Sequence, residues 1–312
     1  MTRALSEAEI EVRLGPEFTG RFGATLPPHL PAGDLTVEAV RDVDDSLVVF
    51  APESATVRRI VRADGSELEI RLHDVSSSSA ILWIHGGGMY LGSARADDLL
   101  CQRLSHALGV SVAAVDYRLA PEHGHPEPLE DCYLALQWLA ERHDHVVVAG
   151  GSAGGGLAVG LALLARDRSG PRIAGVQAWY PMLDDRATAS SLELEHTPVW
   201  NGRLSALGWS SYLGGRPADQ YAAPARASDL DGLPPTFLDV GDLDLFIDEV
   251  TDFAARLAGA GVPVEFHTYP AAVHAFEIIN PDAAVSRTAT ERRLSWLSTI
   301  LDEAPGRNSE AP

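Results

Sequence analysis

The sequence predicts an α/β fold with a central, mostly parallel sheet and helices on both faces. From about residue 80 onward, short β-branched runs alternate with segments of helical length and composition. Several of these runs, such as 80–84 and 146–149, are apolar throughout, which is typical of strands buried on both faces. The chain has 312 residues, enough for one such domain with a large core.

The elements are expected in a regular order. Residues 1–50 carry short amphipathic pieces, of which 35–43 is expected to be a helix with Asp34 as its N-cap. Two alternating runs around Asp64-Gly65 predict a β-hairpin. Further strands are expected at 80–84, 110–115, 146–149, 173–179, 235–240 and 262–269, and helices at 99–108, 129–140, 157–165, 247–257 and 284–301.

Residues 184–225 interrupt this alternation. The segment contains Trp200, Trp209, Tyr212 and Tyr221 among scattered prolines and glycines. A long aromatic-rich insertion between core strands is a candidate lid over a site, and the alternative is an exposed decoration. Four large aromatic side chains favour packing against another part of the molecule.

Composition and charge exclude several classes of partner. The net charge of −20 argues against nucleic acid and against an anionic membrane surface. No apolar run has the length of a membrane span, and residues 1–14 lack the apolar region of a secretory signal, so a cytoplasmic protein is expected. Cys101 and Cys132 fall in apolar helical patterns and are expected to be buried free thiols rather than a disulfide or metal site.

The strongest chemical signal is the stretch Gly150-Gly151-Ser152-Ala153-Gly154. It follows an apolar strand and precedes a helix, which is the setting of a nucleophile elbow of G-x-S-x-G type. Glycines at the flanking positions remove side chains that would collide in the sharp turn. The alternative is a tight turn that binds phosphate or only packs closely, and the motif alone does not separate the two.

Two later strands are followed by the residue types that a serine nucleophile needs. A base must take the serine proton, and a third group must orient that base. Asp242 and Asp244 follow the strand that ends near Val240, and His274 follows the strand that ends near Tyr269. Spacing alone leaves Asp242 and Asp244 equally plausible as the orienting carboxylate.

A glycine loop follows the strand that ends at Ile84. In His85-Gly86-Gly87-Gly88, backbone N–H groups can point into a site and stabilise an oxyanion. A glycine triplet alone is more often a turn, but here it precedes an elbow in the order typical of an oxyanion loop. His85 itself is expected to be a structural hydrogen-bonding residue rather than a base.

With these motifs, the sequence resembles the hormone-sensitive-lipase-like esterases of the α/β-hydrolase superfamily, from about residue 35 to 300. The matching stretches are 85–88, 116–122, 152–155, 241–249 and 274–276, with Trp209, Tyr212 and Leu213 in the insertion. The resemblance implies an α/β-hydrolase fold with a helical cap. It also implies Ser152 as nucleophile, His274 as general base, Asp244 as the orienting carboxylate, and Gly87, Gly88 and Ala153 as oxyanion donors.

The same resemblance divides the chain into a core and a cap. Residues 1–50 and the insertion 184–225 are expected to form the cap, 51–183 and 226–303 the core, and 304–312 a loose tail. The chain departs from the family at Gly151, where an acidic residue is usual, and at Gly156, where asparagine is usual. Leu245 stands where the family has proline, which is a minor change.

Other residues are candidates for binding. Met89 and Tyr90 follow the glycine loop, and Trp200 and Trp209 lie in the insertion, so all four are candidates for the substrate pocket, with core packing as the alternative. His123 and His125 resemble a metal pair but lie in a proline-rich loop without a partner motif. No metal or organic cofactor is expected.

The sequence therefore predicts a serine carboxylesterase that hydrolyses short- to medium-chain acyl esters of small molecules through an acyl-enzyme. An amidase, formamidase or lactone hydrolase on the same triad is the nearest alternative. The sequence does not separate these reactions, because the leaving group is recognised by the cap. A receptor of the same fold that binds a small ligand without turnover is a more distant one. A homodimer is left open.

Overall fold

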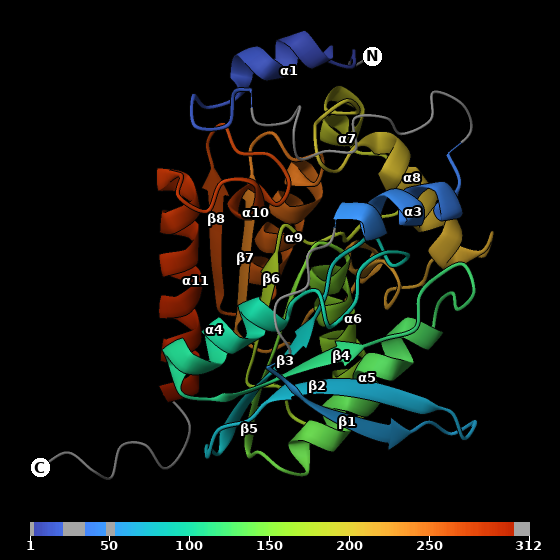
Figure 1. Cartoon of the computed structure of the whole chain (residues 1–312), viewed down its shortest axis with the longest axis vertical. Helices are drawn as coiled ribbons and strands as arrows, with labels where there is room; N and C mark the ends of the chain where they lie inside the picture. Colours follow the sequence, from blue (N-terminus) through green and yellow to red (C-terminus); the bar gives the residue numbers. More distant parts are fainter. Residues whose placement is uncertain (1–2, 21–34, 48–53, 303–312) are drawn as a thin grey trace, which may run out of the picture.

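The computed structural model describes residues 3–20, 35–47 and 54–302, and these contain an eight-stranded sheet (Figure 1). The spatial order of its strands is β1-β2-β4-β3-β5-β6-β7-β8. The strands are β1 (Thr56–Val61), β2 (Glu67–His73), β3 (Ser79–Ile84), β4 (Ser111–Asp116), β5 (His145–Gly151), β6 (Gly175–Trp179), β7 (Thr236–Gly241) and β8 (Val264–Tyr269). The predicted α/β class is confirmed.

The sheet is parallel except at the edge formed by the hairpin. β1 and β2 pair antiparallel around the predicted Asp64-Gly65 turn, and β2 pairs antiparallel with β4. All pairs from β4 to β8 are parallel. Parallel strands place their carboxyl ends at one edge, so the loops that follow β3, β5, β7 and β8 can meet there.

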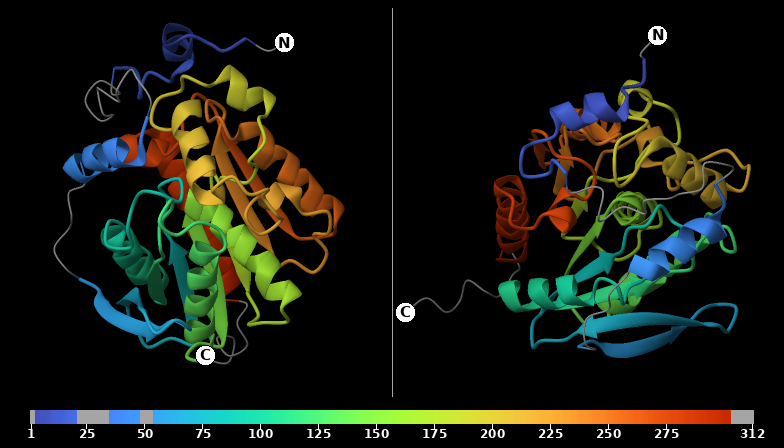
Figure 2. Two further views of the ribbon diagram at one scale, coloured as in Figure 1. Left: turned by 90° about the vertical axis from the view of Figure 1, so that its right-hand side faces the viewer. Right: turned by 45° about the horizontal axis from the view of Figure 1, so that its top comes forward.

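Helices cover both faces of the sheet (Figure 2). On one face, α4 (Asp98–Leu108) and α11 (Ala284–Asp302) pack together, and on the other α5 (Glu127–Ala140) packs on α6 (Ala153–Asp167). α9 (Ile247–Gly259) packs on β7 and β8. These helices and the eight strands correspond to the predicted elements within a few residues at each end.

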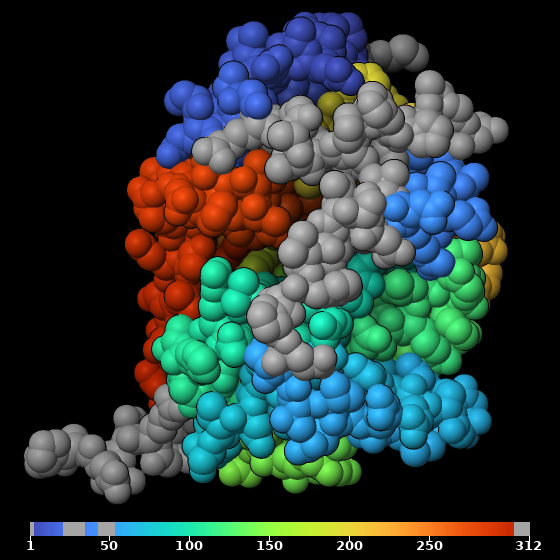
Figure 3. Space-filling model, viewed as in Figure 1, coloured from blue at the N-terminus to red at the C-terminus, as the bar shows by residue number. Residues whose placement is uncertain are grey.

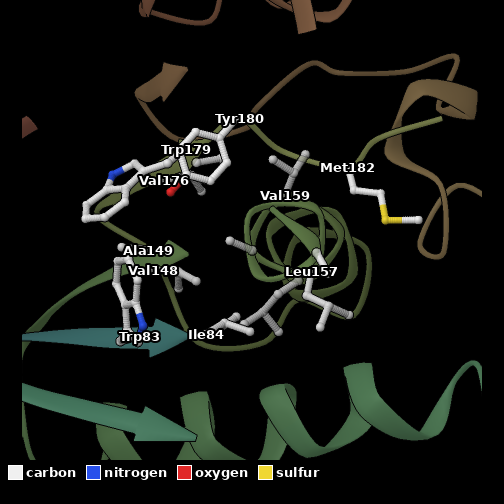
Figure 4. Packing of buried hydrophobic residues seen from close by; sticks show 14 of the residues in the cluster. Trp83, Ile84, Val148, Ala149, Leu157, Val159, Val176, Trp179, Tyr180 and Met182 are labelled. Carbon is white, nitrogen blue, oxygen red and sulfur yellow. The ribbon is translucent and has the colours of Figure 1, made fainter. Parts of the chain in front are cut away.

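α6 occupies the centre of the core. Every residue from Ala153 to Ala165 is buried, so this helix is apolar on all sides, as a helix enclosed by other elements must be. Its side chains, including Leu157, pack among those of β3, β5 and β6 (Figure 4). Trp83 and Trp179 meet edge to face beside the elbow, with ring centroids 4.8 Å apart. This packing fixes the position of the turn at the start of α6.

The insertion 184–225 contains α7 (Ala189–Glu193), α8 (Gly202–Leu213) and the start of a 3₁₀ turn, η1 (Pro224–Arg226). α1 (Glu7–Arg13) lies beside α7, where Leu5 N donates to Glu193 O at 2.8 Å and Arg13 pairs with Glu193 at 3.2 Å. The space-filling view shows residues 3–20 at the end of the molecule opposite the β1–β2 hairpin (Figure 3). Residues 3–20 and α7 of the insertion therefore lie together at one end of the molecule (Figure 1).

The predicted helix near residue 40 is α3 (Val37–Leu47), which begins two residues later than expected. Thr36 occupies the capping position, since its hydroxyl accepts a hydrogen bond from Ala39 N at 3.2 Å. Asp34, the predicted cap, and the predicted loose tail 304–312 lie outside the described residues. Among the described helices, none is both long and apolar enough to cross a membrane.

Candidate active site

Four loops meet at the carboxyl edge of the sheet. β3 and β5 are neighbours, with Ile84 opposite Gly150, so the glycine loop and the elbow start side by side. β7 and β8 are neighbours in the same way, with Gly241 opposite Tyr269. The sheet topology thus brings together segments that are more than a hundred residues apart in the sequence.

Ser152 lies on a sharp turn between β5 and α6. Its φ of 57° and ψ of −121° are outside the ordinary regions for a residue with a side chain, so the conformation is strained. A Cβ atom at Gly150 would lie 2.5 Å from Gly154 O, and one at Gly154 would lie 2.0 Å from Ile84 O. Only glycine fits at either position, which explains the spacing of the motif.

A chain of two hydrogen bonds joins Ser152, His274 and Asp244. His274 Nε2 lies 2.9 Å from Ser152 Oγ, and His274 Nδ1 lies 2.7 Å from Asp244 Oδ2. The carboxylate requires the proton on Nδ1, which leaves Nε2 free to accept the serine proton. All three side chains are buried, with 7% of Ser152 and none of Asp244 exposed. The arrangement is that of a nucleophile, a base and an orienting carboxylate.

Asp244 is held by the loop around it and by the insertion. Its second oxygen accepts a hydrogen bond from Phe246 N at 3.0 Å. From the insertion, Thr197 Oγ1 donates to Leu243 O and Ser190 Oγ donates to Leu245 O, both at 2.9 Å. The residues before and after Asp244 are therefore each held by a hydroxyl group of the insertion. Neither hydroxyl was predicted from the sequence.

The structure separates the two candidate carboxylates. Asp242 is exposed to solvent, although part of its side chain is covered by the protein. Its backbone N–H donates to Tyr269 O at 2.9 Å. Partial burial raises the pKa of the Asp242 carboxyl, and its hydrogen bonds from Ala271 and Ala272 oppose that rise. Among the hydrogen bonds of the described residues, only the carboxylate of Asp244 reaches His274.

The glycine loop lies directly against the elbow. A Cβ atom at Gly86 would lie 3.0 Å from Gly151 O and 3.4 Å from the Cβ of Ser152. Gly87 and Gly88 have φ values of 108° and 61°, which favour glycine. Their backbone N–H groups and that of Ala153, at the first position of α6, donate to none of the described residues. Three donors near Ser152 are thus available to a ligand.

His85 supports the loop, as expected. Its Nδ1 donates to Gly86 O at 2.8 Å, and its ring stacks on Tyr117 with centroids 4.1 Å apart. Tyr117 Oη donates to His85 O at 3.0 Å. Burial lowers the pKa of His85, so its imidazole stays neutral and serves as a structural hydrogen-bonding group.

Of the candidate pocket residues, Trp200 has a described ring contact with His274. Its ring centroid is 6.2 Å from that of His274 and 6.0 Å from that of Tyr90. Met89 and Tyr90 are fully buried, and Tyr90 Oη donates to Leu204 O of the insertion at 3.5 Å. Trp209 is also buried and packs against Tyr212, with ring centroids 6.4 Å apart, and has no described ring contact with His274.

A buried polar network behind His274 was missed by the sequence analysis. The ring of Tyr180 meets that of His274 edge to face at 4.7 Å, and Tyr180 Oη donates to Glu277. Arg293 of α11 lies 3.1 Å from Glu277 Oε1 and forms two hydrogen bonds with Asp239 of β7, at 2.7 and 3.1 Å. No motif marks these residues, because they come from the loop after β6, from β7, from α10 (Phe276–Ile279) and from α11.

The two departures from the family pattern occupy different environments. A Cβ atom at Gly156 would lie 2.1 Å from Met182 O, so the loop after β6 packs on the helix backbone and leaves no room for a side chain. A Cβ atom at Gly151 would lie 3.5 Å from the ring of Tyr180, an ordinary contact distance. Only Gly156 is required by the packing around it.

The remaining candidates lie elsewhere. His123 Nδ1 is 2.7 Å from Glu127, and His125 contacts Tyr212 Oη at 3.2 Å and Asp219 at 3.1 Å, so the two histidines bond to different groups. Within the described part of the chain, no three metal-ligating side chains form a cluster. Cys101 and Cys132 are buried free thiols, as predicted.

A surface cavity of about 510 Å³ lies beside His125, away from the hydrogen-bonded chain. It is lined by residues of α5, α6 and the end of the insertion, among them Arg168, Arg216 and Tyr221. Arg168 is paired with Glu130. None of its lining residues belongs to the hydrogen-bonded chain or the glycine loop.

Comparison with known proteins agrees with this geometry. Residues 81–278 match a family model described as alpha/beta hydrolase fold. The chain is 35% identical to esterase LipI of Mycobacterium tuberculosis, over 73% of this chain and 75% of the relative. It is 33% identical to carboxylesterase NlhH of Mycobacterium tuberculosis, over 80% of this chain and 84% of the relative.

Solved structures show the same likeness over almost the whole chain. A bacterial heroin esterase superposes with a TM-score of 0.84 and 36% identity, covering 93% of this chain and 98% of that one. Esterase LipW from Mycobacterium marinum gives a TM-score of 0.82 and 31% identity, covering 96% and 98%. The chain therefore belongs to the α/β-hydrolase fold family, among the carboxylesterases similar to hormone-sensitive lipase, and is a carboxylic ester hydrolase.

Proposed function

We propose that Ser152, His274 and Asp244 are the catalytic triad of this carboxylesterase. The observation that carries the proposal is the unbroken hydrogen-bond chain from Asp244 through His274 to Ser152 Oγ. A serine hydroxyl becomes nucleophilic when a neighbouring base accepts its proton and a carboxylate orients that base. The strained elbow supports the proposal, because strain of this kind is found at functional turns.

The reaction proceeds in two halves. Ser152 Oγ attacks the ester carbonyl carbon while His274 Nε2 takes its proton, and a tetrahedral oxyanion forms. Cleavage of the bond to the alkoxy oxygen releases the alcohol, which takes the proton from His274. Water then attacks the acyl-enzyme with His274 again as base, and Ser152 is regenerated as the acid leaves.

The oxyanion is held by the N–H groups of Gly87, Gly88 and Ala153. These three groups donate to no described residue and surround the elbow, which supports the assignment. The N-terminus of α6 adds its positive end to the same place. Loss of one such donor typically costs about 10²–10³ in turnover.

The insertion 184–225 and the described part of the N-terminal segment form a cap over the triad. Thr197 and Trp200 of the insertion contact the loop of Asp244 and the ring of His274. Met89, Tyr90 and Trp200 line the acyl or alcohol side of the site, whereas Trp209 supports the cap. An enclosed site of this kind favours short- to medium-chain acyl esters over a lipid–water interface.

The proposal is tested by Ser152→Ala, with p-nitrophenyl butyrate as substrate. We expect kcat to fall by about 10⁴-fold or more while the far-ultraviolet circular dichroism spectrum stays unchanged. Ser210→Ala, at an exposed position of α8, is the matched control and should retain full activity. Unchanged hydrolysis by a folded Ser152→Ala protein would show that another residue is the nucleophile.

A further inference from the structure

Trp200 is held in a fixed position between the insertion and the catalytic edge. Thr197, three residues earlier, is hydrogen-bonded to Leu243 O at 2.9 Å, and Trp200 N donates to Pro198 O at 3.0 Å. Asn201, directly after it, caps α8 by accepting a hydrogen bond from Leu204 N at 3.0 Å. These hydrogen bonds fix the backbone on both sides of Trp200 and so restrict the position of its indole ring.

The indole ring of Trp200 lies between the glycine loop and the ring of His274. A Cβ atom at Gly88 would lie 2.2 Å from Cη2 and 2.6 Å from Cζ2 of Trp200, so this side of the indole rests on the glycine loop. Cζ2 and Nε1 are bonded to the same ring carbon, which places the N–H on the side of the ring near the loop. The rings of His274 and Tyr90 lie beside the indole, with centroids 6.2 and 6.0 Å away.

The N–H of Trp200 is buried and has no acceptor among the described residues, although the residue is only 6% exposed. Two other buried indoles are satisfied: Trp83 Nε1 donates to Asp97 at 2.7 Å, and Trp179 Nε1 donates to Gln177 at 2.9 Å. Buried N–H groups in folded proteins are nearly always paired, because an unpaired donor loses its hydrogen bond to water. An unpaired donor beside a nucleophile points to an acceptor on the substrate.

We infer that Trp200 Nε1 donates a hydrogen bond to a second oxygen atom of the substrate, next to the ester that is cleaved. This inference rests on the proposed function of the site. In that function the carbonyl oxygen is already bound by backbone N–H groups, so the indole is left for a different acceptor. The favoured substrates are small esters with an ether, hydroxyl or carbonyl oxygen within two or three bonds of the ester group, and Trp200 is a specificity-determining residue.

Matched ester pairs isolate this hydrogen bond. p-Nitrophenyl methoxyacetate and p-nitrophenyl butyrate have acyl groups of equal length that differ only in one oxygen for one methylene. 2-Methoxyethyl acetate and butyl acetate make the same comparison on the alcohol side. In each pair the ratio of kcat/KM is compared between the wild-type protein and Trp200→Phe, so the different intrinsic reactivities of the two esters cancel.

We expect Trp200→Phe to lower the ratio by about three- to tenfold in at least one pair, the range for one neutral hydrogen bond. The pair that responds identifies the acyl or the alcohol side. Trp200→His keeps a ring N–H and should retain part of the preference. Trp138→Phe, on α5 beside Arg142, is the matched control and should leave both ratios unchanged.

The two proposals fail in different ways. If Trp200→Phe and Trp200→His change the rates of both members of each pair equally, Trp200 acts only through its size and the inference is wrong. The same conclusion holds if the wild-type ratios match those of uncatalysed alkaline hydrolysis. If the folded wild-type protein hydrolyses none of the four esters, the proposed function fails, and the inference fails with it.

Discussion

Asp244 depends on neighbours that lie outside the proposed triad. Phe246 N fills one carboxylate oxygen, and hydroxyls of the insertion hold the carbonyls on either side of it. A carboxylate held in this way presents one oxygen to His274 in a fixed direction. In the proposed triad, Asp244 would orient the imidazole and fix its tautomer.

Asp244→Asn should lower kcat for p-nitrophenyl butyrate by about 10³–10⁴-fold. The amide removes the negative charge that fixes the proton on His274 Nδ1 and stabilises the imidazolium. Asp242→Asn is the matched control, since Asp242 forms no described hydrogen bond with His274, and its activity should stay within about threefold of the wild type. Steady-state kinetics on both variants decides the question. The reverse result would assign the role to Asp242.

The two unusual glycines around the elbow should respond differently to substitution. Gly156→Ala puts a methyl group against Met182 O, so we expect a loss of about 1–3 kcal/mol in the free energy of unfolding. Gly151→Ala has room beside Tyr180 and should stay within about 0.5 kcal/mol of the wild type. Urea denaturation measures both. Equal losses would show that the packing at Gly156 is not the cause.

At the scale of elements, the strands and core helices could be predicted because burial imposes a pattern on them. β3 is buried at every position, and α6 is buried from Ala153 to Ala165, so both appear in the sequence as uninterrupted apolar segments. The insertion has no such periodicity. α7 is held by hydrogen bonds of Ser190 with Asp248 and Leu245, and α8 accepts one from Tyr90 Oη at Leu204 O. Such contacts leave little trace in the local sequence.

The same reasoning separates the parts of the site. Three parts of the site each follow a recognisable strand: Ser152, Gly86 and His274. That they lie close together could therefore be predicted from the sheet topology. The choice of Asp244 over Asp242 came from family resemblance, because two residues of spacing do not determine which carboxylate faces the histidine. Glu277 could not be predicted, since its role depends on side chains from other elements.

Glu249 links α9 to the root of the insertion. This buried carboxylate accepts hydrogen bonds from Leu183 N at 2.7 Å and Asp184 N at 3.3 Å. Burial raises its pKa well above the usual range, and the two N–H donors oppose that rise. The folded state therefore binds the proton more tightly than the unfolded chain does. The stability from this group is complete below the unfolded pKa of about 4.3 and is lost as pH rises through the folded pKa.

Glu249→Gln should consequently become more stable relative to the wild type as pH rises from 5 to 9. Glutamine keeps an oxygen acceptor for both N–H groups but carries no charge to bury. Thermal denaturation across this pH range measures the difference in Tm, and Glu291→Gln at an exposed position of α11 is the control. A difference in Tm that is independent of pH would contradict the ionisation of Glu249 as its source.

At the scale of the whole molecule, the loops at the carboxyl edge of the sheet carry the proposed catalytic groups, and the proposed cap limits access to them. Ser152 is 7% exposed and His274 is 3% exposed. The net charge of −20 adds a field that disfavours polyanionic ligands around this enclosed site. With the proposed cap, these features predict small, uncharged esters as the preferred substrates.

A series of p-nitrophenyl esters should therefore show a maximum of kcat/KM at acyl chains of about four to six carbons. Longer chains have to displace the buried residues of the insertion, and shorter ones bury less apolar area. p-Nitroanilides of the same acids, measured in parallel, test preference for esters over amides. Activity that rises steadily to long chains would contradict the cap proposed for residues 184–225.

The central claim is that Ser152 is the nucleophile activated by His274. The most direct measurement is labelling with a fluorophosphonate, followed by mass spectrometry of the proteolytic peptides. We expect a single adduct on Ser152, absent in Ser152→Ala and formed far more slowly in His274→Gln. A folded wild-type protein that forms no adduct, or forms it on another serine, would contradict the claim, and the former result would favour a binding protein without turnover.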